Sequence, residues 1–366
     1  MNLDPFFRLR KLIEDRFPEG DPTKIALHIG DPKGQPRQEI YRAIINKLDL
    51  SCYHPPQTLP ELKNSIIYYN KAVHGVELKE NQITAVHGTK SAIAQLPMIF
   101  GKSITQLSKS RICIPDLSYP TYFFPADFLS FNISFYSADK PVLSSLFTDY
   151  LLKYVIINNP HNPLGRVIKK DELENLAKKA QKDGFILISD ECYIDIYKNQ
   201  KPNSLLEFDK TGEFRNLLVL NSLSKSSCLP GLRSGFLAGD SNLIEKFSNY
   251  YGTTGNTLSR VNQAVSAMAW KDLEYIKENR ERYQELLQNF AERSGLEAPE
   301  GAFYFFIKTP IDGEEFAVEL LKKYGIKVMP GKYLDFQRSN RWNNYVRVPI
   351  AEKLEDKTID DLLSML

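Results

Sequence analysis

The sequence predicts an α/β protein whose mostly parallel β-sheet lies between layers of helices. Short apolar runs occur at residues 154–157, 185–188 and 217–220, and a segment with helical periodicity lies between the first two. Strands that are apolar on both faces and alternate with helices are typical of a parallel sheet covered on both sides. After residue 239 the pattern changes to long helices followed by short strands, which predicts a second, smaller α+β domain.

The length and charge of the chain limit the classes of protein that it can represent. At 366 residues it is longer than a single hydrophobic core usually supports, which also favours two domains. The formal net charge is only +2 and no long run of Lys or Arg occurs. The charge pattern therefore favours neither nucleic acid nor an anionic membrane as a partner.

Cysteine usage and the N-terminal sequence predict a soluble, cytoplasmic protein. We expect reduced thiols and no bound metal, because no metal-ligand spacing occurs among Cys52, Cys113, Cys192 and Cys228. The N-terminus mixes charged and apolar residues and lacks the cleavage site of a signal peptide. Apolar runs are far shorter than the roughly 20 residues that span a bilayer.

Short strands and helices alternate through the first 240 residues. The first element is an amphipathic helix at 6–16, which places Phe7, Leu9, Leu12 and Ile13 on one apolar surface. The strands are short apolar runs that end at glycine, proline or polar residues. We expect further helices at 60–72, from 91 onward and at 171–182, and strands at 25–29, 83–88, 111–115, 154–158, 185–188 and 217–220.

Longer helices dominate the sequence after residue 239. Their outer faces are charged, and we expect the one at 273–291 to connect the larger domain to the smaller one. The remaining helices are predicted at 243–251, 261–270 and 314–323, and the strands of the smaller domain at 301–306, 328–331 and 344–349.

The segment at 221–239 contains the most informative pattern. Lys225 follows an apolar run, and the residues around it are small hydroxyl residues, the glycines at 231 and 235, and Arg233. Hydroxyls and a guanidinium suit a phosphate, and a partly desolvated lysine beside a cation has the lowered pKa that Schiff-base chemistry requires. A strand end followed by a polar loop would show the same local pattern, so other segments are needed to distinguish the two interpretations.

Polar residues also follow several other predicted strands. Gly88, Thr89 and Lys90 form a turn before a helix, where free backbone N–H groups bind anions, although many strand–helix turns look alike. Asn162 follows the strand at 154–158, and strand ends of this kind hold ligands in open α/β sheets. Asp190 ends a buried strand, where a carboxylate needs a cationic or hydrogen-bonding partner. A helix N-cap is the alternative interpretation of Asp190.

Five separated segments resemble the class I and II aminotransferases, which are fold-type I enzymes that use pyridoxal 5′-phosphate (PLP). They are YHPPQTLPEL at 53–62, GTK at 88–90, NPHNPLG at 159–165, SDECY at 189–193, and SLSK at 222–225 with Arg233 downstream. The tyrosine loop departs from the family pattern because Thr58 replaces a glycine and Lys63 replaces an arginine. Dinucleotide-binding and P-loop motifs are absent from the sequence.

The resemblance implies an aspartate-aminotransferase-like fold. The larger, PLP-binding domain, at residues 41–275, would contain a mostly parallel sheet of the seven-stranded type. Residues 1–40 and 276–366, from the two ends of the chain, would form the smaller α+β domain.

The resemblance also implies roles for individual residues. Lys225 would carry PLP and move a proton, Asp190 would keep the ring nitrogen protonated, and Tyr193 would contact the phenolic oxygen. The residues implied to bind PLP are Gly88, Thr89 and Lys90 (the last mainly through its backbone), Tyr119 as a stacking ring, Asn162, Asp190, Tyr193, Ser222, Lys225, Arg233 and Tyr53. Those implied to bind the substrate are Gly30, Asn162 and Arg347, whose guanidinium would pair with the α-carboxylate.

The implied partners are an amino acid, a 2-oxo acid and a second copy of the chain. Tyr53 would reach the phosphate in the neighbouring subunit, so the active site would be completed across a homodimer interface. The implied reaction is amino-group transfer, with 2-oxoglutarate as the expected acceptor.

Several further stretches resemble the bacterial N-succinyldiaminopimelate aminotransferases of lysine biosynthesis. They are FFRLRKLIE, IALHIGDPK, SLSKSSCLPGLRSGFLAGD, AMAWKDLEYIKENRERYQE and VMPGKYLDF. An aminotransferase for aspartate or another amino acid is the main alternative, because fold and cofactor do not determine the substrate. A carbon–sulfur lyase and an effector-sensing module also use this fold, although we expect no helix-turn-helix extension before it here.

Overall fold

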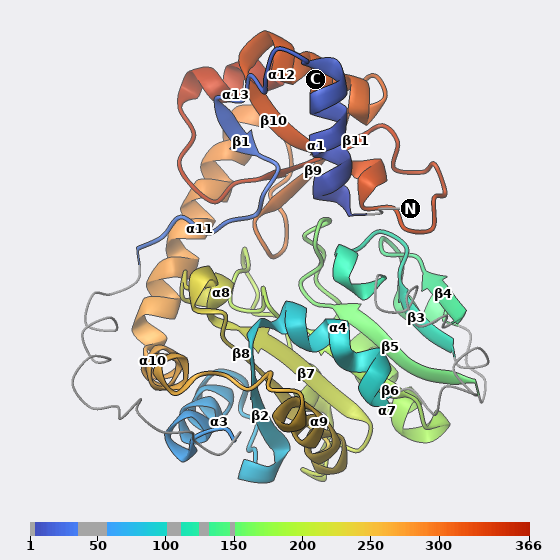
Figure 1. Ribbon diagram of the computed structural model, residues 1–366, viewed down its shortest axis with the longest axis vertical. Helices are drawn as coiled ribbons and strands as arrows, with labels where there is room; N and C mark the ends of the chain where they lie inside the picture. The colour runs from blue at the N-terminus through green and yellow to red at the C-terminus, as the bar shows by residue number, and fades with distance from the viewer. Residues whose placement is uncertain (1–3, 36–56, 101–110, 124–131, 147–150) are drawn as a thin grey trace.

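The computed structural model describes residues 4–35, 57–100, 111–123, 132–146 and 151–366. These residues form two lobes, with a seven-stranded sheet in one and a four-stranded sheet in the other (Figure 1). The N-terminal helix and the C-terminal elements lie together in the smaller lobe (Figure 1).

The large sheet has the strand order β2-β8-β7-β6-β5-β3-β4. Neighbouring strands are parallel except at β8, which runs antiparallel to both β2 and β7. This arrangement confirms the predicted mostly parallel sheet. Its strands are β2 (Ile83–Val86), β3 (Arg111–Pro115), β4 (Asn132–Tyr136), β5 (Leu152–Asn158), β6 (Ile186–Asp190), β7 (Leu217–Ser222) and β8 (Gly235–Gly239).

The apolar runs of the sequence are explained by two hydrophobic cores, one on each face of this sheet. In β5, Val155 and Ile157 belong to one core, whereas Tyr154 and Ile156 belong to the other. Because successive side chains of a strand point to opposite faces, a strand between two cores needs apolar residues at every position.

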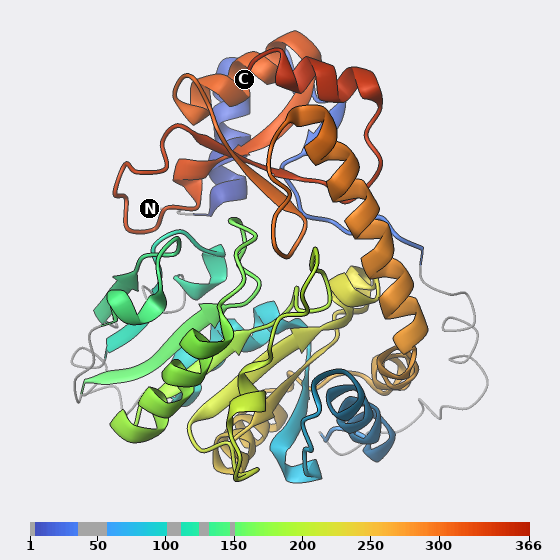
Figure 2. The ribbon, with the colours of Figure 1, turned by 180° about the vertical axis from the view of Figure 1, so that it is seen from behind.

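Helices cover both faces of the large sheet. Those that share a core with Val155 are α3 (Pro60–His74), α7 (Lys170–Asp183) and α10 (Arg260–Lys271). Those on the opposite face are α4 (Gly88–Phe100) and α9 (Ser241–Thr253). Figure 1 looks onto the α4 and α9 face, and Figure 2 looks onto the α7 face.

The smaller lobe is assembled from both ends of the chain. Its sheet has the order β1-β10-β11-β9, and β1 pairs in parallel with β10. The long helix α11 (Leu273–Ser294) runs from the large lobe into the small one, as predicted (Figure 2). The other elements are α1 (Pro5–Arg16), β1 (Ile25–Leu27), β9 (Tyr304–Lys308), α12 (Gly313–Tyr324), β10 (Ile326–Pro330), β11 (Tyr345–Pro349) and α13 (Asp356–Leu363). The domain boundary expected at residue 40 lies outside the described residues, and the boundary at 275 stays a prediction.

Some element bounds differ from the prediction for identifiable reasons. Helix α4 begins at Gly88 rather than near residue 91, because the GTK turn itself forms its first turn. The edge strand β4 was not predicted, since its side chains are mostly half-buried and its sequence lacks a continuous apolar run. The structure also contains the short helices α8 (Leu223–Ser226), η1 (Glu80–Gln82), η2 (Pro120–Tyr122), η3 (Val142–Ser144), η4 (Leu205–Phe208), η5 (Pro230–Leu232) and η6 (Gly331–Tyr333).

Gly239 provides a test of the close contact between β7 and β8. Its φ is +139°, and a Cβ there would overlap the carbonyl oxygen of Leu217 on the neighbouring strand. We expect Gly239→Ala to lower the free energy of unfolding by at least about 3 kcal/mol, measured by urea denaturation. Gly20→Ala is the matched control because Gly20 has a similar φ of +129° with no atom within 4 Å. It should cost only about 1–2 kcal/mol, and equal losses for the two variants would contradict the steric explanation.

Candidate active site

A cavity of about 220 Å³ lies between the two lobes and contains most of the residues singled out in the sequence. Its walls come from α1, the segment after β1, β9 and β11 of the small lobe and from strand ends and the segments after them in the large lobe. The lining residues are Phe6, Ile29, Gly30, Thr89, Lys90, Tyr119, Tyr122, Asn158, Asn162, Asp190, Cys192, Tyr193, Ser222, Ser224, Lys225, Pro230, Arg233, Tyr304 and Arg347.

Lys225 lies in α8, the single helical turn that follows β7. Ser222 caps this turn by accepting a hydrogen bond from Ser224 N at 3.1 Å. The Lys225 side chain crosses to the small lobe, where Nζ donates to Gly30 O at 2.5 Å. Burial lowers the pKa of the Lys225 amine to about 8 from its ordinary value of 10.5. The amine is therefore much closer to its neutral, nucleophilic form than a surface lysine would be.

Asp190 ends β6 as a fully buried carboxylate with donors on both oxygens. Tyr122 Oη donates to Oδ2 at 2.7 Å, and Cys192 N donates to Oδ1 at 3.2 Å. Burial raises the pKa of Asp190, and these hydrogen bonds act in the opposite direction. The residues that follow form a turn rather than a helix, so the alternative role as a helix N-cap is excluded. A cation facing Asp190 would offset its burial.

An anion-binding cradle lies at the N-terminus of α4. Gly88 has φ of +72°, and a Cβ there would collide with the guanidinium of Arg233. Only glycine therefore allows Arg233 to approach the free N–H groups of this helix. The cavity is also lined by Thr89, Lys90, Ser222 and Ser224. The combination of helix terminus, guanidinium and hydroxyls suits a phosphate.

Arg347 lies on β11, nearly fully buried, and faces the cavity from the small lobe. Its Nη1 donates to Asn162 Oδ1 at 3.1 Å and its Nη2 donates to His28 O at 2.8 Å. Its Nε has no hydrogen-bond partner among the described residues. Asn162 is held by a hydrogen bond from its own N–H to Asn158 Oδ1 at 2.8 Å. The guanidinium is thus positioned with donor capacity left for an anionic ligand.

Tyr122, Cys192 and Tyr304 are among the cavity residues that the sequence did not single out. Tyr122 donates to Asp190, and Tyr304 Oη lies 2.8 Å from Tyr193 Oη. Cys192 Sγ lies 3.1 Å from Thr89 Oγ1. Cys192 belongs to the SDECY segment and Tyr122 follows the predicted Tyr119 by three residues, so proximity to a predicted site residue was the only available signal. Tyr304 belongs to an aromatic strand whose sequence does not indicate which side chain faces the cavity.

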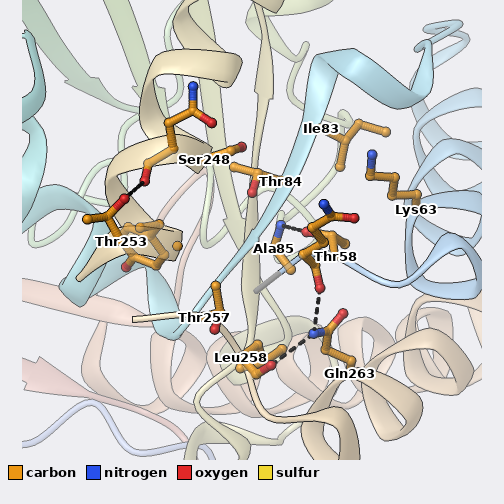
Figure 3. Close-up of a pocket in the computed structure, with 14 residues that line it drawn as sticks. Thr58, Lys63, Ile83, Thr84, Ala85, Ser248, Thr253, Thr257, Leu258 and Gln263 are labelled. Carbon is orange, nitrogen blue, oxygen red and sulfur yellow. Dashed lines mark hydrogen bonds between the residues drawn. The ribbon is translucent and has the colours of Figure 1, made fainter. Parts of the chain in front are cut away.

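The predicted Tyr53 lies outside the described residues, but the end of its loop is described. Gln263 on α10 accepts from Leu59 N at 2.7 Å and donates to Gln57 O at 3.1 Å. Figure 3 shows Gln263 and Thr58 on the wall of a second pocket, which shares no lining residue with the candidate active site. Thr58 Oγ1 accepts from Ala85 N at 2.8 Å, which satisfies a backbone donor of the edge strand β2. The threonine that departs from the family pattern therefore has a structural use.

The described residues fit PLP as a cofactor. The cavity combines a desolvated lysine that could bind the aldehyde, a buried carboxylate that could pair with the ring nitrogen and a cradle that could hold the phosphate. The fold and the site together define a PLP-dependent enzyme of fold type I. The class I and II aminotransferase model matches residues 22–366, and the chain belongs to this family of PLP-dependent transaminases.

Known proteins of this family share the fold along nearly the whole chain. The aspartate aminotransferase of Pyrococcus abyssi is 30% identical over 377 residues, covering 95% of this chain and 92% of its own. The structure of aminotransferase AspB from Helicobacter pylori has a TM-score of 0.87 and 31% identity, covering 99% of this chain and 98% of its own. A probable N-succinyldiaminopimelate aminotransferase from Thermus thermophilus has a TM-score of 0.87 at 22% identity, covering 99% and 100%.

The residues that the structure describes provide neither a membrane-spanning helix nor a cluster of metal ligands. No helix there is both long and apolar enough to cross a membrane. No group of three or more His, Cys, Asp or Glu side chains there could hold a metal ion.

The burial of Lys225 should make the stability of the cofactor-free protein depend on pH. Because the folded pKa is about 8 and the ordinary value is 10.5, folding releases a proton between these values and stability rises with pH across that window. Below pH 8 the buried amine costs about 3 kcal/mol. We expect Lys225→Met to stabilise the cofactor-free protein, by an amount that shrinks from pH 8 to pH 10.5 in urea titrations. Lys277→Met, at an exposed position, should show no such trend, and a pH-independent effect of Lys225→Met would contradict the shifted pKa.

Proposed function

We propose that this chain transfers the amino group of N-succinyl-LL-2,6-diaminopimelate to 2-oxoglutarate, a reaction of lysine biosynthesis. The observation that carries the reaction type is the desolvated Lys225 amine, which lies in one cavity with Asp190 and Arg347. The substrate is supported by the five sequence stretches that resemble this group of enzymes, and the Thermus thermophilus neighbour bears on the fold alone.

Three residues would carry the chemistry. PLP supplies an electron sink that stabilises negative charge at the substrate Cα. Lys225 Nζ would take the proton from Cα as a general base and return a proton as a general acid, since burial lowers its pKa to about 8. Asp190 would hold the protonated ring nitrogen, and Tyr193 would donate to the phenolic oxygen.

The other residues would bind and orient. Arg347 would pair with the α-carboxylate through its planar guanidinium, exchanging contacts that it now makes with Asn162 and His28. Asn162 would also face the phenolic oxygen, Tyr119 would stack on the ring, and Gly30 would lie beside the carboxylate. The phosphate would be bound by Gly88, Thr89, Lys90, Ser222 and Arg233, together with Tyr53 of a second copy in a homodimer.

Aspartate aminotransferase activity is the second candidate. It is supported by the Pyrococcus abyssi relative, which is 30% identical and bears that name. The two candidates share every proposed role above and differ only in the part of the substrate beyond the α-carbon.

A panel of amino donors tests the proposed substrate. The purified holoenzyme would receive N-succinyl-LL-2,6-diaminopimelate, aspartate or an aromatic amino acid, with and without 2-oxoglutarate, and glutamate would be measured. We expect the succinylated donor to give the highest kcat/KM and turnover to require the oxo acid. A higher kcat/KM for aspartate would overturn the substrate assignment, and release of ammonia without an oxo acid would indicate a lyase.

Replacement of Arg347 tests the carboxylate site. Lysine cannot form a bidentate pair with a carboxylate, so Arg347→Lys should lower kcat/KM for amino acids by about 10- to 100-fold. The loss should disappear for an amine that lacks the α-carboxylate, which serves as the internal control. An equal loss for both kinds of donor would show that Arg347 acts on the fold and not on the carboxylate.

A further inference from the structure

Tyr304 joins the small lobe to Tyr193 within the cavity. It lies on β9, nearly fully buried, and its Oη is 2.8 Å from Tyr193 Oη. The guanidinium carbon of Arg347 lies 4.7 Å from the centre of the Tyr304 ring. A Cβ at residue 30 would overlap the Tyr304 hydroxyl oxygen, so Gly30 provides the space in which this hydroxyl lies. Tyr304 thus touches three residues to which the site has assigned roles.

The direction of the hydrogen bond between the two tyrosines follows from counting protons. Burial raises the pKa of both hydroxyls, so each keeps its single proton near neutral pH. Within the described residues, the Tyr304 hydroxyl makes no other hydrogen bond than that with Tyr193. A hydroxyl has one donor and two acceptor positions. If Tyr193 gives its proton to a cofactor oxygen, Tyr304 must be the donor between the two tyrosines.

We propose that Tyr304 is a positioning residue that donates to Tyr193 Oη and thereby directs the Tyr193 proton to the phenolic oxygen of PLP. The inference rests on the proposed roles of Lys225 and Tyr193. Hydrogen bonds in a chain polarise one another, so a donor behind Tyr193 makes Tyr193 a stronger donor. Arg347 lies on the ring of Tyr304 and favours this direction, because a nearby cation makes a hydroxyl proton easier to share.

The charged or titratable groups that face the pair, among the described residues, include Arg347, Cys192, Lys225 and Tyr119. Arg347 faces both tyrosines from β11, and Cys192 approaches both from the turn after β6. The Lys225 amine lies 6.0 Å from the centre of the Tyr193 ring. Packing alone could also explain a buried Tyr304, so the test must separate the hydroxyl from the ring.

The test uses the visible absorbance of the PLP-loaded enzyme as a function of pH. Loss of a donor leaves the phenolic oxygen more negative, which holds the neighbouring proton on the Lys225 nitrogen more tightly. We expect Tyr304→Phe to raise the midpoint of the absorbance change by about 0.5–1 pH unit, equivalent to about 0.7–1.4 kcal/mol. The shift should be smaller than that of Tyr193→Phe, which removes the donor itself. Tyr283→Phe is the matched control, because Tyr283 is buried in the same aromatic cluster and does not line the cavity.

A double variant shows whether Tyr304 acts through Tyr193. Tyr193→Phe with Tyr304→Phe should titrate like Tyr193→Phe alone, because the chain is already broken. The inference would be overturned if the two shifts were additive. It would also be overturned if the midpoint of Tyr304→Phe equalled that of the wild type or that of Tyr283→Phe. In each of these cases the proposed function would still stand. A wild-type holoenzyme without a Lys225-linked, pH-dependent band would overturn both.

Discussion

The amine of Lys225 is buried between the two lobes and therefore loses its hydration. This loss of hydration is the constraint on which the arrangement of the neighbouring groups depends. The amine of Lys225 finds one backbone acceptor, Gly30 O, in the opposite lobe. Its lowered pKa comes mainly from burial rather than from a neighbouring charge. Because Lys225 Nζ contacts Gly30 of the small lobe, the burial and the lowered pKa of this amine depend on the contact between the two lobes.

The topology of the large sheet explains how distant residues meet at this amine. Strands β5, β6 and β7 are parallel neighbours, and Asn158, Asp190 and Ser222 are their last residues. Polar side chains at these ends face the cavity, while the strand interiors remain apolar on both faces. The small lobe then closes this edge with Arg347 on β11 and Tyr304 on β9.

Much of the fold and part of the site could be predicted because the relevant signals are local. The apolar run at 154–157 predicts a buried strand because both faces of β5 meet a core. Gly88 and Lys225 stand in short segments whose residue types already suit an anion and a reactive amine. In contrast, β4 was missed because an edge strand is half exposed and needs no continuous apolar run. Tyr304 was missed because strand register depends on β11, which lies about forty residues further along the chain.

The sequence by itself determined the family and the alternation of strands and helices, and it singled out Lys225 as the candidate lysine, because these depend on residue type and spacing. Only the tertiary structure decided which neighbours each polar group has. It placed Tyr122 on Asp190, Arg233 against Gly88 and Tyr304 on Tyr193. Burial and hydrogen-bond partners are set by segments that are distant along the chain. A residue's protonation and donor direction therefore cannot be inferred from its own segment.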